Sequence, residues 1–154
     1  MESHLPIKVV QFVAILFTVL ALIPGAAHLI ELPNKMALDR ESYMTVQRIY
    51  RGWALAGVVL LGALLTTLWL AILSRSQALP MLLAFSAFAL LLVTLITFFV
   101  WVYPVNQATA QWTIATTDFE RLRARWEYAH AVNAVLTLVA VATTAAASLT
   151  WRNI

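Results

Sequence analysis

The chain has 154 residues, of which 62% are hydrophobic and 11% are charged, and its formal net charge is +3. A soluble domain is roughly 45–50% apolar and about 25% charged, and a globule of this size has too little interior to hide so much apolar surface. The composition therefore excludes an ordinary cytosolic domain and indicates a membrane protein. Because the chain has no cysteine, disulfides, thiolate metal sites and cysteine nucleophiles are excluded. With so few cations, nucleic acid is not an expected partner.

Apolar runs long enough to cross a bilayer follow one another along the chain, at about residues 9–30, 53–73, 78–103 and 129–151. A helix of roughly 20 apolar residues spans a hydrocarbon core of about 30 Å and satisfies its own backbone in lipid. The first run is longer than the apolar region of a signal peptide, so we interpret it as a retained span. The sequence predicts an all-α fold: one domain over residues 1–154, built as an integral membrane up-down four-helix bundle.

The connections between these spans are unequal in length. Residues 74–77 form a tight turn, whereas residues 31–52 and 104–128 make longer and more polar connections. Asp39 is placed to cap a short helix in the first of these. Residues 117–120 have the form of a capping box, so the fourth helix should begin near residue 118. We also expect Pro24 to kink the first helix and Gly25 to permit a close helix contact.

Charge is concentrated at one end of the predicted bundle, because an up-down arrangement brings both long connections to the same side. That end holds most of the ten cations and seven anions. They are Lys35, Arg40, Arg48, Arg51, Arg121, Arg123 and Arg125, with Glu31, Asp39, Glu41, Asp118, Glu120 and Glu127. The positive-inside rule places this end in the cytoplasm, but Lys8 and Arg75 at the other end suit the opposite orientation, which stays open.

A histidine and a glutamate lie three residues apart at this end of two different spans. The first span ends with His28 and Glu31, and the fourth begins with Glu127 and His130. Residues three apart share a helix face. Because the two helices run in opposite directions, the histidines should meet at one depth and the glutamates at a shallower one.

Several kinds of site fit this arrangement. His28, Glu31, Glu127 and His130 could ligate a transition metal such as iron or copper, and His28 with His130 could ligate a haem. The same four residues could act as a metal-free acid–base site, since histidine exchanges protons near neutral pH. Alternatively, the glutamates pair with neighbouring arginines and only hold the helix ends together.

Arginines, aromatic residues and amides surround the ends of the spans. At this depth such side chains are typical interfacial anchors and lipid-phosphate partners. They could also form a rim that steers an anionic or phenolic substrate toward the histidines. The candidate substrate-binding residues are Arg48, Tyr50, Arg51, Asn106, Trp112 and Arg125.

Short motifs resemble those of a known family. They are His-x-x-Glu-Leu-Pro-Asn at 28–34, Tyr-Pro-x-Asn at 103–106 and Arg-Trp-Glu-x-x-His at 125–130. With the short spans, they make the chain similar to a family of small bacterial membrane proteins of unknown function, to which the fungal anthrone oxygenases are assigned. Those enzymes convert an anthrone to an anthraquinone with molecular oxygen. The resemblance implies site positions at Asn106, Trp112, Arg125 and His130. Family members often carry an arginine shortly after the last histidine, where this chain has Asn133.

We therefore expect a membrane oxidoreductase, anthrone oxygenase-like, that acts on an aromatic or quinone-like small molecule. The expected location is the bacterial inner membrane, and the expected partners are the lipid bilayer and a lipophilic substrate; homo-oligomerisation is left open. The competing hypotheses are a non-enzymatic membrane module that binds lipid or a partner protein, and a haem-binding protein.

Overall fold

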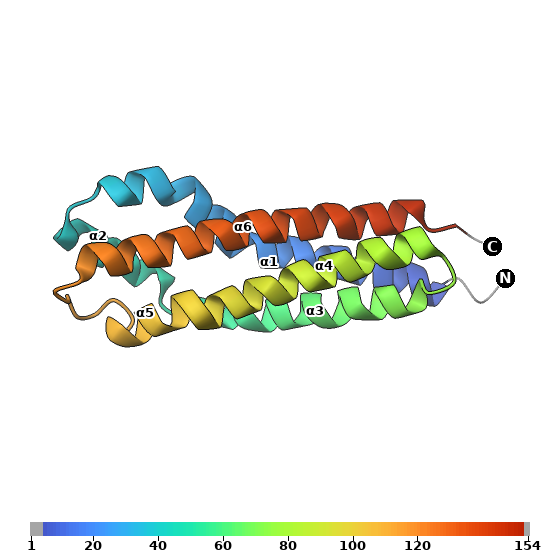
Figure 1. Cartoon of the computed structure of the whole chain (residues 1–154), viewed down its shortest axis with the longest axis horizontal. Coiled ribbons are helices and arrows are strands. Elements are labelled where there is room, and N and C mark those ends of the chain that lie inside the picture. The colour runs from blue at the N-terminus through green and yellow to red at the C-terminus, as the bar shows by residue number, and fades with distance from the viewer. Residues whose placement is uncertain (1–4, 153–154) are drawn as a thin grey trace.

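The computed structural model of the protein describes residues 5–152, and the regular structure in that range is entirely helical (Figure 1). Short helical elements fill the two long connections and the end of the third span. The long helices are α1 (Leu5–Ala37), α3 (Ala56–Leu73), α4 (Ala78–Thr97) and α6 (Phe119–Thr150). The short ones are α2 (Arg40–Val46), the 3-10 turns η1 (Gln47–Tyr50) and η2 (Trp53–Leu55), the π-helical turn η3 (Phe98–Val102) and α5 (Tyr103–Ala108).

The long helices form an up-down bundle in which each helix has two neighbours. α1 packs against α3 and α6, and α4 packs against the same two helices from the other side. The chain enters α1 and leaves α6 at one end, while α2 and α5 lie at the opposite end (Figure 1). All four long segments are apolar enough to cross a membrane, and large side chains such as Phe12, Leu65 and Leu149 are exposed on their outer faces. The predicted all-α membrane bundle is confirmed.

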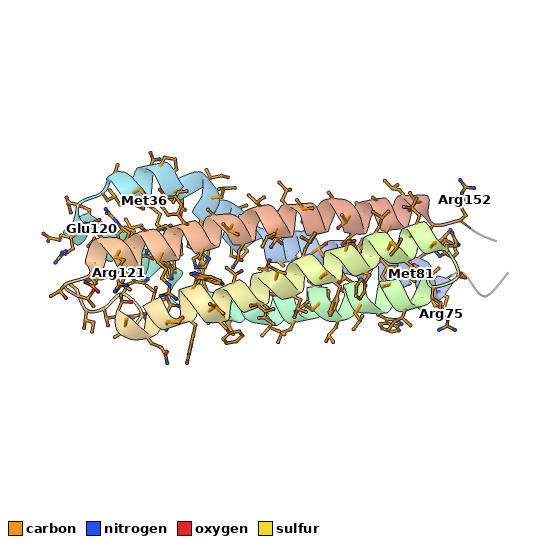
Figure 2. The ribbon with its side chains drawn as sticks, in the orientation of Figure 1. Met36, Arg75, Met81, Glu120, Arg121 and Arg152 are labelled. Atoms are coloured by element: carbon orange, nitrogen blue, oxygen red, sulfur yellow. The ribbon has the colours of Figure 1, made fainter. Side chains whose placement is uncertain are left out.

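The charged side chains gather at the two ends, as Figure 2 shows for those it labels. Glu120 and Arg121 lie at the end that carries α2, and Arg75 and Arg152 lie at the other. The interior between the ends combines leucines with many small residues and threonines, and Ala14, Ala84 and Ala140 are fully buried. Small residues let helix backbones approach closely, which provides the packing that stabilises helices in lipid.

α1 and α6 approach each other closely at Gly25. A Cβ atom added there would lie 3.1 Å from the Cα of Ala134, so the two backbones are in direct contact. This confirms the role expected for Gly25. The contact lies about one helical turn inward from His28 on α1 and from His130 on α6, and it therefore fixes how these two residues face each other.

The first helix is longer than predicted. We expected it to end near residue 30, but α1 continues through Pro33 to Ala37. Proline inside a helix removes one backbone hydrogen bond and is normally read as a stop. Here the last turns of α1 carry side chains that bind to α6 and η1, described below, and these contacts compensate for the lost bond.

The two predicted helix caps have different outcomes. Asp39 caps α2 as expected: its carboxylate accepts a 2.8 Å hydrogen bond from the backbone N–H of Ser42, and this bond holds the pKa of Asp39 below its usual range. The capping box predicted at residues 117–120 is wrong. α6 does begin at Phe119, but the Asp118 side chain accepts no capping hydrogen bond and instead pairs with Arg121.

Candidate functional site

The histidines predicted to meet are in contact. The imidazole rings of His28 and His130 have centroids 4.3 Å apart and are tilted by 31°. The indole of Trp126 packs edge-on against both, with centroid distances of 4.9 Å and 4.2 Å. His28 is only 3% exposed, and the Nε2 atom of His130 is buried with no hydrogen-bond partner among the described residues. The histidine pair thus has one ring nitrogen, Nε2 of His130, that forms no hydrogen bond within the described chain.

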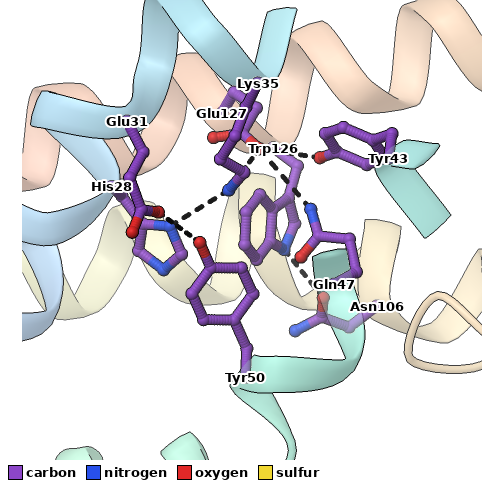
Figure 3. A network of polar contacts seen from close by, with 9 residues as sticks. All are labelled: His28, Glu31, Lys35, Tyr43, Gln47, Tyr50, Asn106, Trp126 and Glu127. Carbon is purple, nitrogen blue, oxygen red and sulfur yellow. Dashed lines mark hydrogen bonds and ion pairs between the residues drawn. The ribbon is translucent and has the colours of Figure 1, made fainter. Parts of the chain in front are cut away.

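A buried ion pair lies beside His28 (Figure 3). The ammonium of Lys35 is 2.6 Å from Oε1 of Glu127, and both side chains are almost wholly buried. Lys35 Nζ also lies 3.4 Å from Nδ1 of His28, within hydrogen-bonding distance, and sits over the ring of Trp126 at 4.9 Å from its centroid. The cation next to the histidines is therefore a lysine of α1, joined directly to a carboxylate of α6.

Sequence reasoning missed Lys35 because it ended the first helix at residue 30. Had the helix been continued through Pro33, Lys35 would have fallen four residues after Glu31 and seven after His28. Those spacings place all three side chains on one helix face. The lysine was counted among the charges of this end, but its alignment with the histidine could have been read from the spacing.

Glu127 is held by two further side chains from the first long connection. The hydroxyl of Tyr43 donates a 2.8 Å hydrogen bond to Oε1 of Glu127, and the amide of Gln47 donates to the same oxygen at 3.5 Å. Tyr43 is fully buried, and burial together with the nearby Glu127 charge raises the pKa of its phenol far above the ordinary value. The second oxygen of Glu127, Oε2, is buried and has no partner within residues 5–152.

Glu31 is hydrogen-bonded to a different tyrosine, Tyr50. The hydroxyl of Tyr50 donates a hydrogen bond to Oε2 of Glu31, and the Tyr50 ring packs against His28 at a centroid distance of 4.5 Å. Burial, followed by this bond and the Glu31 charge, raises the pKa of the Tyr50 phenol. The two glutamates lie outward of the histidines along their helices, as expected, but each bonds a different tyrosine (Figure 3).

Asn106 and Trp112, both implied by the family resemblance, support the indole of Trp126. Oδ1 of Asn106 accepts a 2.8 Å hydrogen bond from Nε1 of Trp126. Trp112 is buried and packs edge-on against Trp126 and Tyr43, at centroid distances of 5.8 Å and 5.1 Å. Their observed contacts are internal to the cluster, and their role as substrate contacts stays a prediction.

The three arginines predicted to rim the site take different positions. Arg48 and Arg51 have exposed side chains on either side of Tyr50 in the sequence, and the chain then turns at Gly52, whose φ of 89° is left-handed. Arg125 donates to the backbone carbonyl of Val100, on the outer side of α6. In the described chain none of the three forms a hydrogen bond or ion pair with the histidine cluster, which has Lys35 as its cation.

The predicted metal ligands do not form a metal site as they are arranged. Among residues 5–152, no three His, Cys, Asp or Glu side chains come close enough together to hold an ion. The Lys35 ammonium lies between His28 and Glu127, where a metal shared by these ligands would have to lie. The two imidazole rings are in direct contact, so a haem ligated by both would require the rings to move apart.

Comparison with protein-family models, curated proteins and solved structures finds no match to the chain. The class of protein is therefore defined by its own fold and site. It is a four-helix membrane protein with a network of buried ionisable side chains at one end, centred on His28, Lys35, Glu127 and His130.

Proposed function

We propose that the protein is an oxidoreductase of the bacterial inner membrane, anthrone oxygenase-like, in which the His28–His130 pair removes a proton from a lipophilic aromatic substrate. One observation carries the proposal. The Nε2 atom of His130 is buried and has no hydrogen-bond partner within residues 5–152, while its ring contacts a second imidazole that lies against a buried ammonium. Ionisable side chains buried in a membrane protein usually serve a function, and proton relays are a common one.

The network supplies both a base and a path for the proton. An imidazole accepts and releases protons near neutral pH, which suits it to general-base work. Behind His130 the polar groups continue through His28 and Lys35 to Glu127 and Tyr43. They run outward along α1 and α6 toward the charged end of the bundle, which is the direction in which the proposal has the proton leave.

The substrate class rests on the family resemblance and on the lipid setting. An anthrone carries an acidic methylene C–H, and its removal leaves an anion delocalised over the fused rings. The Lys35 ammonium next to the histidines would stabilise that negative charge. Molecular oxygen is the oxidant: one anthrone and one O2 give one anthraquinone and one water, so atoms and electrons balance without another reductant.

The proposal is tested by separating proton removal from oxidation. The full chain in detergent is mixed with anthrone in D2O without oxygen, and the exchange of methylene hydrogen for deuterium is followed. Oxygen uptake and anthraquinone formation are measured in air, in both cases above the rate without protein. We expect the wild type to accelerate both steps and His130→Gln to abolish both. Arg75→Gln, at the other end of the bundle, is the matched control and should retain both.

Each outcome has a defined meaning. If the wild type accelerates neither step, the proposed function is wrong. If it accelerates exchange but not oxidation, the base is assigned correctly and the oxygenase step is wrong. If His130→Gln and His28→Gln keep full rates in a folded protein, the histidines are not the base.

A second function, a non-enzymatic module, is favoured by a different observation. The network joins α1, α2, η1 and α6 through side chains that are largely buried, which would fix α2 and η1 as a rigid surface for a partner protein. In that case the His28→Gln and His130→Gln variants lose stability and partner binding, and neither the wild type nor the variants accelerate the anthrone reaction. A Soret band in the purified protein would instead support the haem alternative.

A further inference from the structure

A lateral groove of about 690 Å³ runs along the outer side of the bundle between α4, η3 and α6. It is distinct from the histidine cluster, which lies on the inner side of α6. Its lining includes Thr97, Trp101, Arg125, Tyr128 and Val132. Arg125 is the only charged side chain among the groove residues that the structure describes.

The position of Arg125 follows from a proline in the third span. Pro104 has no N–H, so the carbonyl of Val100, four residues earlier, lacks its α-helical donor. The chain forms the π-helical turn η3 at this place, and Nη2 of Arg125 donates to the Val100 carbonyl at 2.6 Å. One hydrogen bond thus holds Arg125, which lines the lateral groove, against η3.

The charge of Arg125 has no counter-ion within the described chain. Its neighbours on α6 are paired, Arg121 with Asp118 and Arg123 with Glu120, whereas no carboxylate of residues 5–152 forms an ion pair with Arg125. Its Nε is buried and has no hydrogen-bond partner in the same range. Of the five N–H donors of the guanidinium, one is bound to the Val100 carbonyl and the Nε–H is buried, which leaves the remaining Nη donors for an anion that enters the groove.

The remainder of the lateral groove has the character of the membrane interface. Trp101 and Tyr128 flank the guanidinium and are 46% and 57% exposed. Aromatic side chains of this kind sit at head-group depth in membranes. Toward the middle of the bundle the lining becomes apolar, with Ala129 and the 53% exposed Val132. A cation at the interface followed by an apolar channel matches one anionic head group and its acyl chain.

We propose that the lateral groove binds an anionic phospholipid of the surrounding bilayer. The lipid phosphate accepts charge-assisted hydrogen bonds from Arg125, the head group lies between Trp101 and Tyr128, and an acyl chain follows α6 past Val132. This inference is independent of the proposed catalysis, because it uses none of the histidine network.

Lipid selectivity measured on the full chain tests the proposal. The protein is purified into mixed micelles with equal amounts of phosphatidylglycerol and phosphatidylcholine, and the lipids that remain bound are counted by native mass spectrometry. A basic side chain near the membrane surface contributes about 1 kcal/mol toward an anionic lipid, which is about a fivefold preference. We expect that preference in the wild type, its loss in Arg125→Gln and its retention in Arg121→Gln, a matched arginine of the same helix whose charge is already paired.

Arg125→Gln also removes the bond to Val100, so a second variant keeps the test sound if that protein unfolds. Val132→Trp fills the apolar part of the lateral groove and leaves the guanidinium and its bond intact. It should lower the amount of bound phosphatidylglycerol while the protein stays folded. Equal binding of both lipids by the wild type, or an unchanged preference in both variants, would overturn the proposal. So would a dimer that Val132→Trp dissociates, because the lateral groove would then be a subunit interface.

Discussion

Lys35 and Glu127 join α1 to α6 through an ion pair of 2.6 Å that solvent hardly reaches. Removing two charges from water costs several kcal/mol per ion, and their attraction repays this only when further hydrogen bonds satisfy the remaining donors and acceptors. Glu127 receives such bonds from Tyr43 and Gln47. A pair of apolar residues would hold these helices together at lower cost, which is why we associate the pair with function rather than with stability alone.

The ion pair predicts a non-additive stability cycle. Lys35→Met and Glu127→Leu each leave one buried charge without its partner, and each should destabilise the protein by about 3–5 kcal/mol. The double variant should recover much of that loss, because neither charge remains. Denaturation in detergent measures all three. Arg121→Gln breaks an exposed pair and should change stability by less than about 1 kcal/mol. Additive losses in the double variant would show that the two residues are not coupled.

The contact at Gly25 predicts that a larger residue will separate the histidines. Gly25→Val places branched carbons against the Ala134 backbone, and overpacking of this kind costs about 1–3 kcal/mol. We expect reduced thermal stability together with reduced proton exchange in the anthrone assay. Gly57→Ala is the control, since a Cβ there meets nothing within 4 Å. Because alanine favours the helix more than glycine does, this variant should be more stable than the wild type by up to about 1 kcal/mol. An unaffected Gly25→Val protein would mean that the helices can move apart freely.

Tyr43 predicts a loss of stability in alkali. Its pKa is raised in the folded protein, so above the ordinary value of about 10 the unfolded chain releases a proton that the folded chain keeps. Stability should therefore be fully present below about pH 10 and fall as the pH rises. Tyr43→Phe removes the ionisable phenol and with it this pH dependence, along with the hydrogen bond to Glu127. The gap in stability between wild type and variant should narrow from pH 9 to about pH 11. A constant gap would contradict the raised pKa.

Lys35 also predicts how the site responds to metal ions. Its ammonium occupies the space between His28 and Glu127, so we expect purified wild-type protein to hold iron or copper only substoichiometrically. Lys35→Ala vacates this position and should increase binding of Co2+, visible as new absorption bands in the optical spectrum. His28→Ala in the Lys35→Ala background should abolish that increase. Stoichiometric metal in the wild type, lost on His28→Ala, would support the metal hypothesis instead.

Much of the candidate site could be predicted from periodicity. The pairing of His28 with His130 followed from the direction of two spans and the three-residue spacing of each histidine from its glutamate, and the rings are in contact. The spacing of Lys35 from His28 would place both on one helix face, but only the structure shows that α1 continues through Pro33, which is normally read as the end of a helix. The distribution of the arginines was also not predictable, because Arg125 is directed outward by a carbonyl that Pro104 leaves without a donor.

The sequence alone determined that the protein lies in a membrane, which segments span it, and which end of the bundle carries most of the charge. These features depend on composition and on runs of apolar residues, which can be recognised without knowing which segments contact one another in the fold. Only the tertiary structure decided which buried groups pair. Whether Glu127 meets a lysine, an arginine or a metal depends on how close α1 and α6 come at Gly25 and Ala134. That distance is set by packing between helices that are far apart in the chain, and the desolvation of each charge follows from it.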